Sequence, residues 1–194
     1  MLYYFVLYKP YEVLSQFSKE GDKKTLKDIC SVPVDVYPVG RLDYDSEGLL
    51  LLTNDRTMNA ALLQPAKGHS RTYLVQVEGA ITSQALQQLQ NGVEISVNGT
   101  THLTRPAKAK MLEKEPAVPE RNPPIRYRKN IPTSWIELTL TEGKNRQVRK
   151  MTAKTGFPTL RLIRYRIGKL SADGWESGEL RTYSKKELTS LVFA

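Results

Sequence analysis

The fold of this chain is decided by GRLDYDSEGLLLLTND, residues 40–55. Its four consecutive leucines must be buried, so the run predicts a core strand at 49–53. A buried run fixes the backbone, and the acids that precede it are therefore held in a defined place. A carboxylate held in this way can have both its rotamer and its environment controlled, as catalysis requires.

The acids of this stretch, Asp43, Asp45 and Glu47, allow several interpretations. A calcium loop is excluded, because its twelfth position is Asn54 where such loops need a bidentate glutamate. Asp43 and Asp45 would stand about 6–7 Å apart on one face of an extended chain, which leaves a glycosidase acid–base pair open. Both are also ordinary turn residues ahead of Gly48.

The segments around this stretch mix strands and helices without strict alternation, which favours an α+β fold over a doubly wound sheet. Hydrophobic periodicity predicts strands at 2–8, 71–78, 135–141 and 160–167. Helices are predicted at 25–30, 54–63, 84–90 and 145–155, with Thr53 or Asn54 capping the second and Ser83 the third. Ser184 and Glu187 form a capping box for a last short helix.

Composition narrows the function classes. Lys+Arg 29 against Asp+Glu 20 in 194 residues gives a net charge of +9, which indicates either a basic solvated face or a polyanionic partner. One cysteine and two histidines rule out a disulfide framework or a cysteine-rich zinc site and supply a zinc triad poorly. The phosphate-binding glycine motifs are absent, so we expect no nucleotide cofactor and no metal.

A second constellation is EGKNRQVRKM, residues 142–151. It opens a run from Lys144 to Lys169 that no acid interrupts. Arg146, Arg149 and Lys150 fall at helical i, i+3, i+4 spacing and share a face. The predominance of arginine suits forked contacts to phosphate.

Residues 115–132 are basic and rich in proline. The prolines exclude a helix and a central strand. The segment is either a solvated connector or a basic arm that orders on a partner. Tyr127, between Arg126 and Arg128, suits stacking on an unpaired base.

These motifs together resemble, in order and residue type, the pseudouridine synthases of the RsuA/RluB/E/F group, which act on ribosomal RNA. The resemblance is carried by FVLYKPY (5–11), the stretch 40–55, TYLVQVEG (72–79), and 142–151 with FPTLRLIR (157–164). Two further segments, RNPPIR (121–126) and IPTSW (131–135), look most like the E-type synthases of large-subunit RNA.

The resemblance implies the pseudouridine synthase α+β fold: a mixed, largely antiparallel sheet with flanking helices and a central cleft. It implies a cofactor-free isomerisation of one uridine in 23S ribosomal RNA. Asp43 would act as nucleophile or as base, with Arg149 as its ionic partner and Tyr73 stacked on the base. RNA contacts are expected from basic and amide side chains, namely Lys9, Arg41, Lys144, Asn145, Arg146, Lys150 and Arg164.

The resemblance also predicts the organisation of the protein. Residues 1–194 are expected to form a single catalytic domain without the N-terminal accessory RNA-binding domain of many relatives. The opening MLYYFVLYKP predicts a strand and not a leader or a membrane span. We therefore expect a cytoplasmic monomer. Two rival functions remain open: an RNA-binding assembly factor without activity, and a nucleic-acid glycosidase that uses Asp43 with Asp45.

Overall fold

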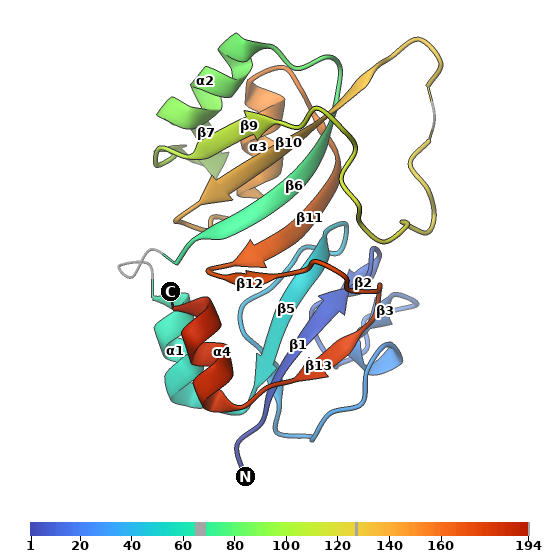
Figure 1. The fold of residues 1–194 in the computed structure, drawn as a ribbon, viewed down its shortest axis with the longest axis vertical. Helices are drawn as coiled ribbons and strands as arrows, with labels where there is room; N and C mark the ends of the chain where they lie inside the picture. Colours follow the sequence, from blue (N-terminus) through green and yellow to red (C-terminus); the bar gives the residue numbers. More distant parts are fainter. Residues whose placement is uncertain (65–68, 127, 194) are drawn as a thin grey trace.

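The computed structural model describes residues 1–64, 69–126 and 128–193, so Tyr127 and its predicted stacking lie outside the described residues. A nine-stranded sheet runs through the molecule in the order β13-β1-β5-β11-β6-β10-β9, with β12 beside β11 and β4 beside β5 (Figure 1). Its strands are β1 (Tyr4–Lys9), β4 (Tyr37–Pro38), β5 (Glu47–Thr53), β6 (Arg71–Glu78), β9 (Lys108–Met111), β10 (Thr133–Leu140), β11 (Thr159–Ile167), β12 (Leu170–Ser171) and β13 (Leu180–Thr182).

The predicted α+β class is confirmed, and so is the largely antiparallel sheet. Neighbouring strands pair antiparallel except β5 and β11, which pair parallel at Ile163↔Glu47 and Arg164↔Gly48. Gly48 permits this pairing. It has a φ of +103°, and a Cβ there would lie 2.4 Å from the Arg164 carbonyl oxygen. The parallel pair brings the start of β5, directly after the acidic loop, beside β11.

Two small sheets complete the strands. In one, β2 (Val13–Leu14) pairs parallel with β3 (Lys24–Thr25). The other is a hairpin of β7 (Glu94–Val97) and β8 (Thr100–Leu103). Its turn has positive φ at Asn98 and Gly99, as a two-residue hairpin loop requires. Sequence reasoning assigned no element to this hairpin or to β9, although Asn-Gly between short apolar runs is a known hairpin signal.

The helices lie close to their predicted places. They are the 3-10 helix η1 (Leu26–Asp28), α1 (Arg56–Leu63), α2 (Ser83–Asn91), α3 (Gln147–Lys154) and α4 (Lys185–Val192). Two caps differ from prediction: Asp55 caps α1, and Thr82 caps α2. In each case the true cap is one or two residues from the predicted one, the usual error at helix ends. The predicted capping box of Ser184 and Glu187 is confirmed.

The helices cover the sheet in two pairs. Helices α1 and α4 lie side by side over the half of the sheet that holds β1 and β5, and α2 and α3 lie at the other half (Figure 1). Consecutive residues of β6 and of β11 belong to different cores. Leu74 and Ile163 pack with α1 and α4, whereas Val75 and Leu162 pack with α2 and α3. Because successive side chains of a strand point to opposite faces, the two helix pairs cover opposite faces. Among the described residues no helix is both long and apolar enough to cross a membrane.

Candidate active site

A cavity of about 670 Å³ gathers most of the predicted site residues. It is lined by the acidic loop before β5, by the loop before α3, and by side chains of β6 and β11. The predicted residues that line it are Asp43, Tyr73, Arg41, Lys144, Asn145, Arg146 and Arg164. Lys9, Arg149 and Lys150 are not among the lining residues that the structure describes.

Asp43 lies in the loop between β4 and β5, and its side chain is 32% exposed. The residue before it is fixed. Leu42 is buried, its amide donates to Ser15 Oγ at 3.1 Å, and the same hydroxyl donates back to its carbonyl at 2.8 Å. The Asp43 carbonyl accepts from the Ser46 amide at 3.0 Å. The backbone is therefore rigid on both sides of a carboxylate that faces the cavity.

The ionic partner of Asp43 differs from the one expected. Arg146 approaches the Asp43 carboxylate at 3.6 Å and forms a forked pair with Asp45 at 3.0 and 2.9 Å. Arg149 belongs to Asp45 instead: its Nη2 donates to the Asp45 carbonyl at 2.6 Å, and its Nε lies 3.3 Å from the Asp45 carboxylate. In this structure Arg149 is thus paired with Asp45, while the charge of Asp43 also acts on it, and the expected pairing of Arg149 with Asp43 stays a prediction. Arg146 has a left-handed backbone (φ +51°) at the start of α3, which aims its guanidinium at the acidic loop.

Electrostatics reinforce this grouping. Burial opposes ionisation of Asp45, but hydrogen bonds from Arg146 and the charge of Arg149 outweigh it, so the Asp45 pKa lies below its ordinary value. The hydrogen bonds to Asp45 raise the pKa of Arg146. Burial lowers the pKa of Arg149, and Asp45 opposes that shift. Asp45 is thus a firmly ionised anchor for both arginines.

Glu47 anchors the loop from the other side. It is buried at the start of β5, and Arg161 of β11 donates to its two oxygens at 2.8 and 2.7 Å. A third bond from Arg161 reaches the carbonyl of Pro119 at 2.6 Å. A buried charge pair with complete hydrogen bonding costs much when one partner is removed. Sequence reasoning missed this pair, although a glutamate leading into four buried leucines needs a cationic partner.

Tyr73 and Arg164 form the floor of the cavity. They are cross-strand partners on β6 and β11. Arg164 is buried, and its Nε donates to the Leu49 carbonyl at 2.7 Å. Burial lowers the pKa of Arg164, and the neighbouring Tyr73 opposes the shift. The expected RNA contact of Arg164 is consequently restricted to a group that enters the cavity.

The structure corrects the expected position of Lys9. It is fully buried, and its Nζ donates to the carbonyls of Pro10 at 2.8 Å and Val13 at 2.7 Å. Burial lowers the Lys9 pKa to about 7, although the charges of Glu47, Asp45 and Asp43 oppose the shift. Because the ammonium group is enclosed, the predicted contact of Lys9 with RNA is wrong. Lys9 instead ties the end of β1 to β2.

The loop before α3 is ordered by Glu142, which sequence reasoning did not single out. Its carboxylate accepts from the Arg105 amide at 2.8 Å, from Gln147 Nε2 at 2.7 Å and from His102 Nε2 at 3.2 Å. Gln147 then accepts from the Lys144 amide at 2.9 Å. These bonds hold Lys144 and Asn145, both exposed, at the cavity mouth.

The described residues offer no group of three or more histidine, cysteine, aspartate or glutamate side chains that could hold a metal ion. The cavity presents the Asp43 carboxylate of the acidic loop, the Tyr73 ring, and a rim of basic side chains. The basic rim residues are Arg41, Arg71, Arg105, Lys144 and Arg146. Such a site can bind a polyanion and expose part of it to Asp43.

Comparison with known proteins gives one family. The profile described as RNA pseudouridylate synthase matches residues 3–154. A protein of Vibrio parahaemolyticus serotype O3:K6 (strain RIMD 2210633), named ribosomal large subunit pseudouridine synthase E, is 49% identical over 171 residues, which are 88% of this chain and 69% of that one. Its namesake from Xanthomonas axonopodis pv. citri (strain 306) is 50% identical over 165 residues, covering 84% of each chain.

The structural comparison agrees. A crystal structure described as that of a pseudouridylate synthase superposes with a TM-score of 0.78 at 27% identity. The match covers 99% of this chain and 74% of the other. The resemblance drawn from the motifs is therefore confirmed by sequence and by fold.

Proposed function

The chain belongs to the RNA pseudouridylate synthase family, and we propose that it isomerises one uridine of 23S ribosomal RNA to pseudouridine with the carboxylate of Asp43. The choice of RNA is supported by the names of the Vibrio and Xanthomonas relatives, which act on the large ribosomal subunit. The basic rim of the cavity suits any RNA, since phosphate contacts carry little sequence information.

One observation carries the assignment of Asp43: its partly exposed carboxylate faces a cavity that also holds Tyr73. The other acids nearby are committed elsewhere. Asp45 is bound by two arginines, and Glu47 is buried against Arg161. Asp43 is thus the carboxylate of this loop that a substrate can reach.

The reaction needs no redox change and no group donor. The N1–C1′ bond of the uridine breaks, the base turns, C5 bonds to C1′, and the proton on C5 is lost while N1 gains one. Asp43 can assist in two ways that share this balance. It can attack the ribose as a nucleophile, or it can remove a ribose proton as a base.

Tyr73 and the arginines have distinct roles in this proposal. Tyr73, on the cavity floor, stacks on the target base and lies where a proton leaves C5. Arg146 is held by its ion pair with Asp45 and also approaches Asp43. It can therefore orient the Asp43 carboxylate. Arg149 does not line the cavity, so we assign it a positioning role through Asp45.

The target uridine must leave its stack to reach Asp43. Arg41 is exposed, lines the same cavity, and stands two residues before Asp43. It is therefore placed to occupy the gap that the base leaves. Lys144, Asn145 and Arg146 line the same cavity and are placed to contact the RNA backbone. Lys150, which lies outside the lining residues, remains an expected contact at greater distance.

The proposal extends to the organisation of the protein. We infer that residues 1–194 act as one catalytic domain, because the sheet continues through both halves by way of β5, β11 and β6. We further propose that it works as a monomer in the cytoplasm, where ribosomal RNA is made and modified. Sedimentation of the free protein and of its RNA complex tests whether the protein is a monomer.

The decisive experiment incubates the protein with protein-free 23S ribosomal RNA and maps modified positions. We expect pseudouridine at one uridine and none with Asp43→Asn. Release of free uracil would establish a glycosidase instead. Tight binding without any change in the RNA would establish an assembly factor. Each outcome separates this proposal from its two rivals.

A further inference from the structure

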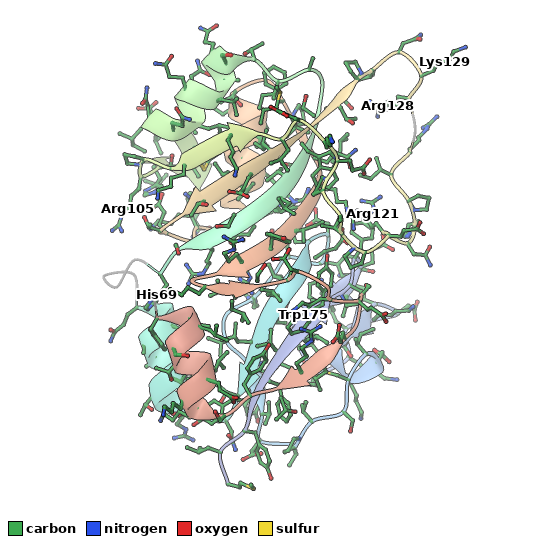
Figure 2. The ribbon with its side chains drawn as sticks, viewed as in Figure 1. His69, Arg105, Arg121, Arg128, Lys129 and Trp175 are labelled. Atoms are coloured by element: carbon green, nitrogen blue, oxygen red, sulfur yellow. The ribbon has the colours of Figure 1, made fainter. Side chains whose placement is uncertain are left out.

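A second cavity lies under residues 125–126 and 128–132, which we call the arm loop. Its volume is about 430 Å³, within the range of small-ligand sites. One wall comes from Gln76, Glu78, Thr133 and Leu160 of the sheet, and the other from the arm loop. Figure 2 places Lys129 at the outer tip of this loop, with Arg128 and Arg121 nearer the sheet. The cavity is distinct from the one that holds Asp43, because the two share no lining residue.

The charges of this cavity favour an anion. Three cations line it, Arg126, Arg128 and Lys129, against one acid, Glu78. Arg128 and Glu78 already form an ion pair at 2.9 Å. Among the ion pairs of the described residues none involves Arg126 or Lys129, and both side chains are exposed. A ligand with one or two phosphates would meet both.

The remaining lining is suited to a flat ring with polar edges. Ile125, Ile131, Pro132 and Leu160 supply apolar surface, and Gln76, Asn130 and Thr133 supply hydrogen-bonding groups. Gln76 Nε2 donates to Thr133 Oγ1 at 3.2 Å, so its amide oxygen is left for another donor. A basic rim suits the phosphates of a single strand, and apolar surface with amide groups can receive a base.

We propose that this cavity is an accessory subsite for one unpaired nucleotide of the substrate RNA, outside the uridine that is modified. Its base packs against Pro132 and Leu160, and its flanking phosphates contact Arg126 and Lys129. The proposal rests on the proposed function in so far as the ligand is the same RNA.

The start of β11 connects this subsite to the catalytic loop. Three consecutive residues do so: the Thr159 carbonyl lies 3.5 Å from Arg149 Nη1, Leu160 lines the arm cavity, and Arg161 holds Glu47. Arg161 also donates to the Pro119 carbonyl, and the Arg121 guanidinium lies 4.1 Å from the centre of the Tyr11 ring. The chain that leads into the arm loop is therefore anchored. The subsite therefore stands at a fixed distance from Asp43. A second nucleotide can then select the target by its spacing along the RNA.

The test uses the full chain and fluorescent hexaadenylate, which contains no uridine. We expect Asp43→Asn to bind it as the wild type does. Arg126→Ser with Lys129→Ser should weaken binding about tenfold and reduce the slope of log K against log salt by about 1.4, the value for two single-strand phosphate contacts. Gln76→Trp, which fills the cavity without changing charge, should weaken binding while leaving the slope unchanged.

The matched control is Lys27→Ser with Lys186→Ser, which removes two exposed cations elsewhere. Equal losses in the two double variants would overturn the proposal, because general electrostatics would then explain the binding. No loss in either would overturn it too. Equal displacement of the probe by hexaglutamate would indicate an acidic protein partner in place of a nucleotide. These binding results do not depend on pseudouridine formation, so they fail separately from the proposed function.

Discussion

Strand β5 has an aspartate near each end, and the two are held in opposite ways. Asp55, after the strand, is 4% exposed and has both oxygens occupied. One accepts from Thr57 and from the Met58 amide, and the other accepts from Tyr4 and Lys185, each at 2.8 Å. Asp43, before the strand, faces a cavity and has a 3.6 Å ion pair with Arg146. A carboxylate with every acceptor position filled stabilises the fold, whereas one left open can meet a substrate.

Asparagine in place of Asp43 should separate chemistry from stability more strongly than any other change proposed here. Asp43→Asn removes the reacting carboxylate, so we expect turnover to fall at least about 1,000-fold, which is about 4 kcal/mol of activation free energy. RNA affinity should stay within a few-fold and the melting temperature should not change. Single-turnover kinetics with 23S RNA and thermal unfolding measure these quantities. An active Asp43→Asn with an inactive Asp45→Asn would move the chemistry to Asp45.

Asp45 sharpens the comparison, because it lies in the acidic loop and yet is fully paired like Asp55. We expect Asp45→Asn to reduce kcat/KM by about 10- to 100-fold, since it loosens Arg146 and Arg149 without removing the reacting group. Arg149→Lys should cost a similar factor, because lysine cannot reproduce the contacts of a guanidinium.

A double-mutant cycle decides which aspartate Arg149 serves. The ion-pair geometry predicts strong coupling in kcat/KM between Arg149 and Asp45, and weaker coupling between Arg149 and Asp43. The reverse order would show that the arginine changes partner when RNA binds. Additive losses with both aspartates would leave Arg149 a role in phosphate contact alone.

These differences mark how far the sequence could lead. The four leucines, the alternation of β6 and the capping box at Ser184 are local signals, and they gave the elements and their class correctly. The resemblance to the family pointed to Asp43 and Tyr73, and the fold brings both to one cavity. The pairing of Arg149 with Asp45 was not readable, because these residues are 104 positions apart and meet only when α3 packs on the sheet. Burial of Lys9 was equally hidden, since a lysine that ends a strand is usually solvated.

At the other end of β5 the effect should fall on stability. Asp55→Asn keeps a good helix cap but loses the charge that Tyr4 and Lys185 bond to, so we expect about 1–2 kcal/mol of destabilisation. Turnover per folded molecule should not change. Urea unfolding and single-turnover kinetics on the same preparation measure both. A loss of turnover as large as that of Asp43→Asn would break the distinction between the two ends.

The pH dependence follows from the same network. Hydrogen bonds from Lys185, Thr57 and Tyr4 outweigh burial and hold the Asp55 pKa below its ordinary value. A depressed carboxyl pKa gives stability that is complete above the unfolded pKa of about 3.9 and is lost as the pH falls below it. The wild type should therefore lose its advantage over Asp55→Asn below about pH 4. A constant difference from pH 7 to pH 3 would contradict this assignment.

The smallest effect concerns Lys185, whose side chain is half exposed although its partner Asp55 is buried. An exposed ammonium retains much of its hydration, so Lys185→Met should lower the melting temperature by less than about 3 °C at pH 7. The shift should shrink in 0.5 M salt, and the midpoint of acid unfolding should move to higher pH, because Asp55 loses one of the groups that keep it ionised. Lys186→Met is the control, since it removes the adjacent, exposed lysine of the same helix. Equal shifts in the two variants, or a shift that salt leaves unchanged, would mean that the charge of Lys185 plays no part. Asp55 would then depend on Tyr4 and the helix cap alone, and the contrast with Asp43 would rest on hydrogen bonds and not on charge.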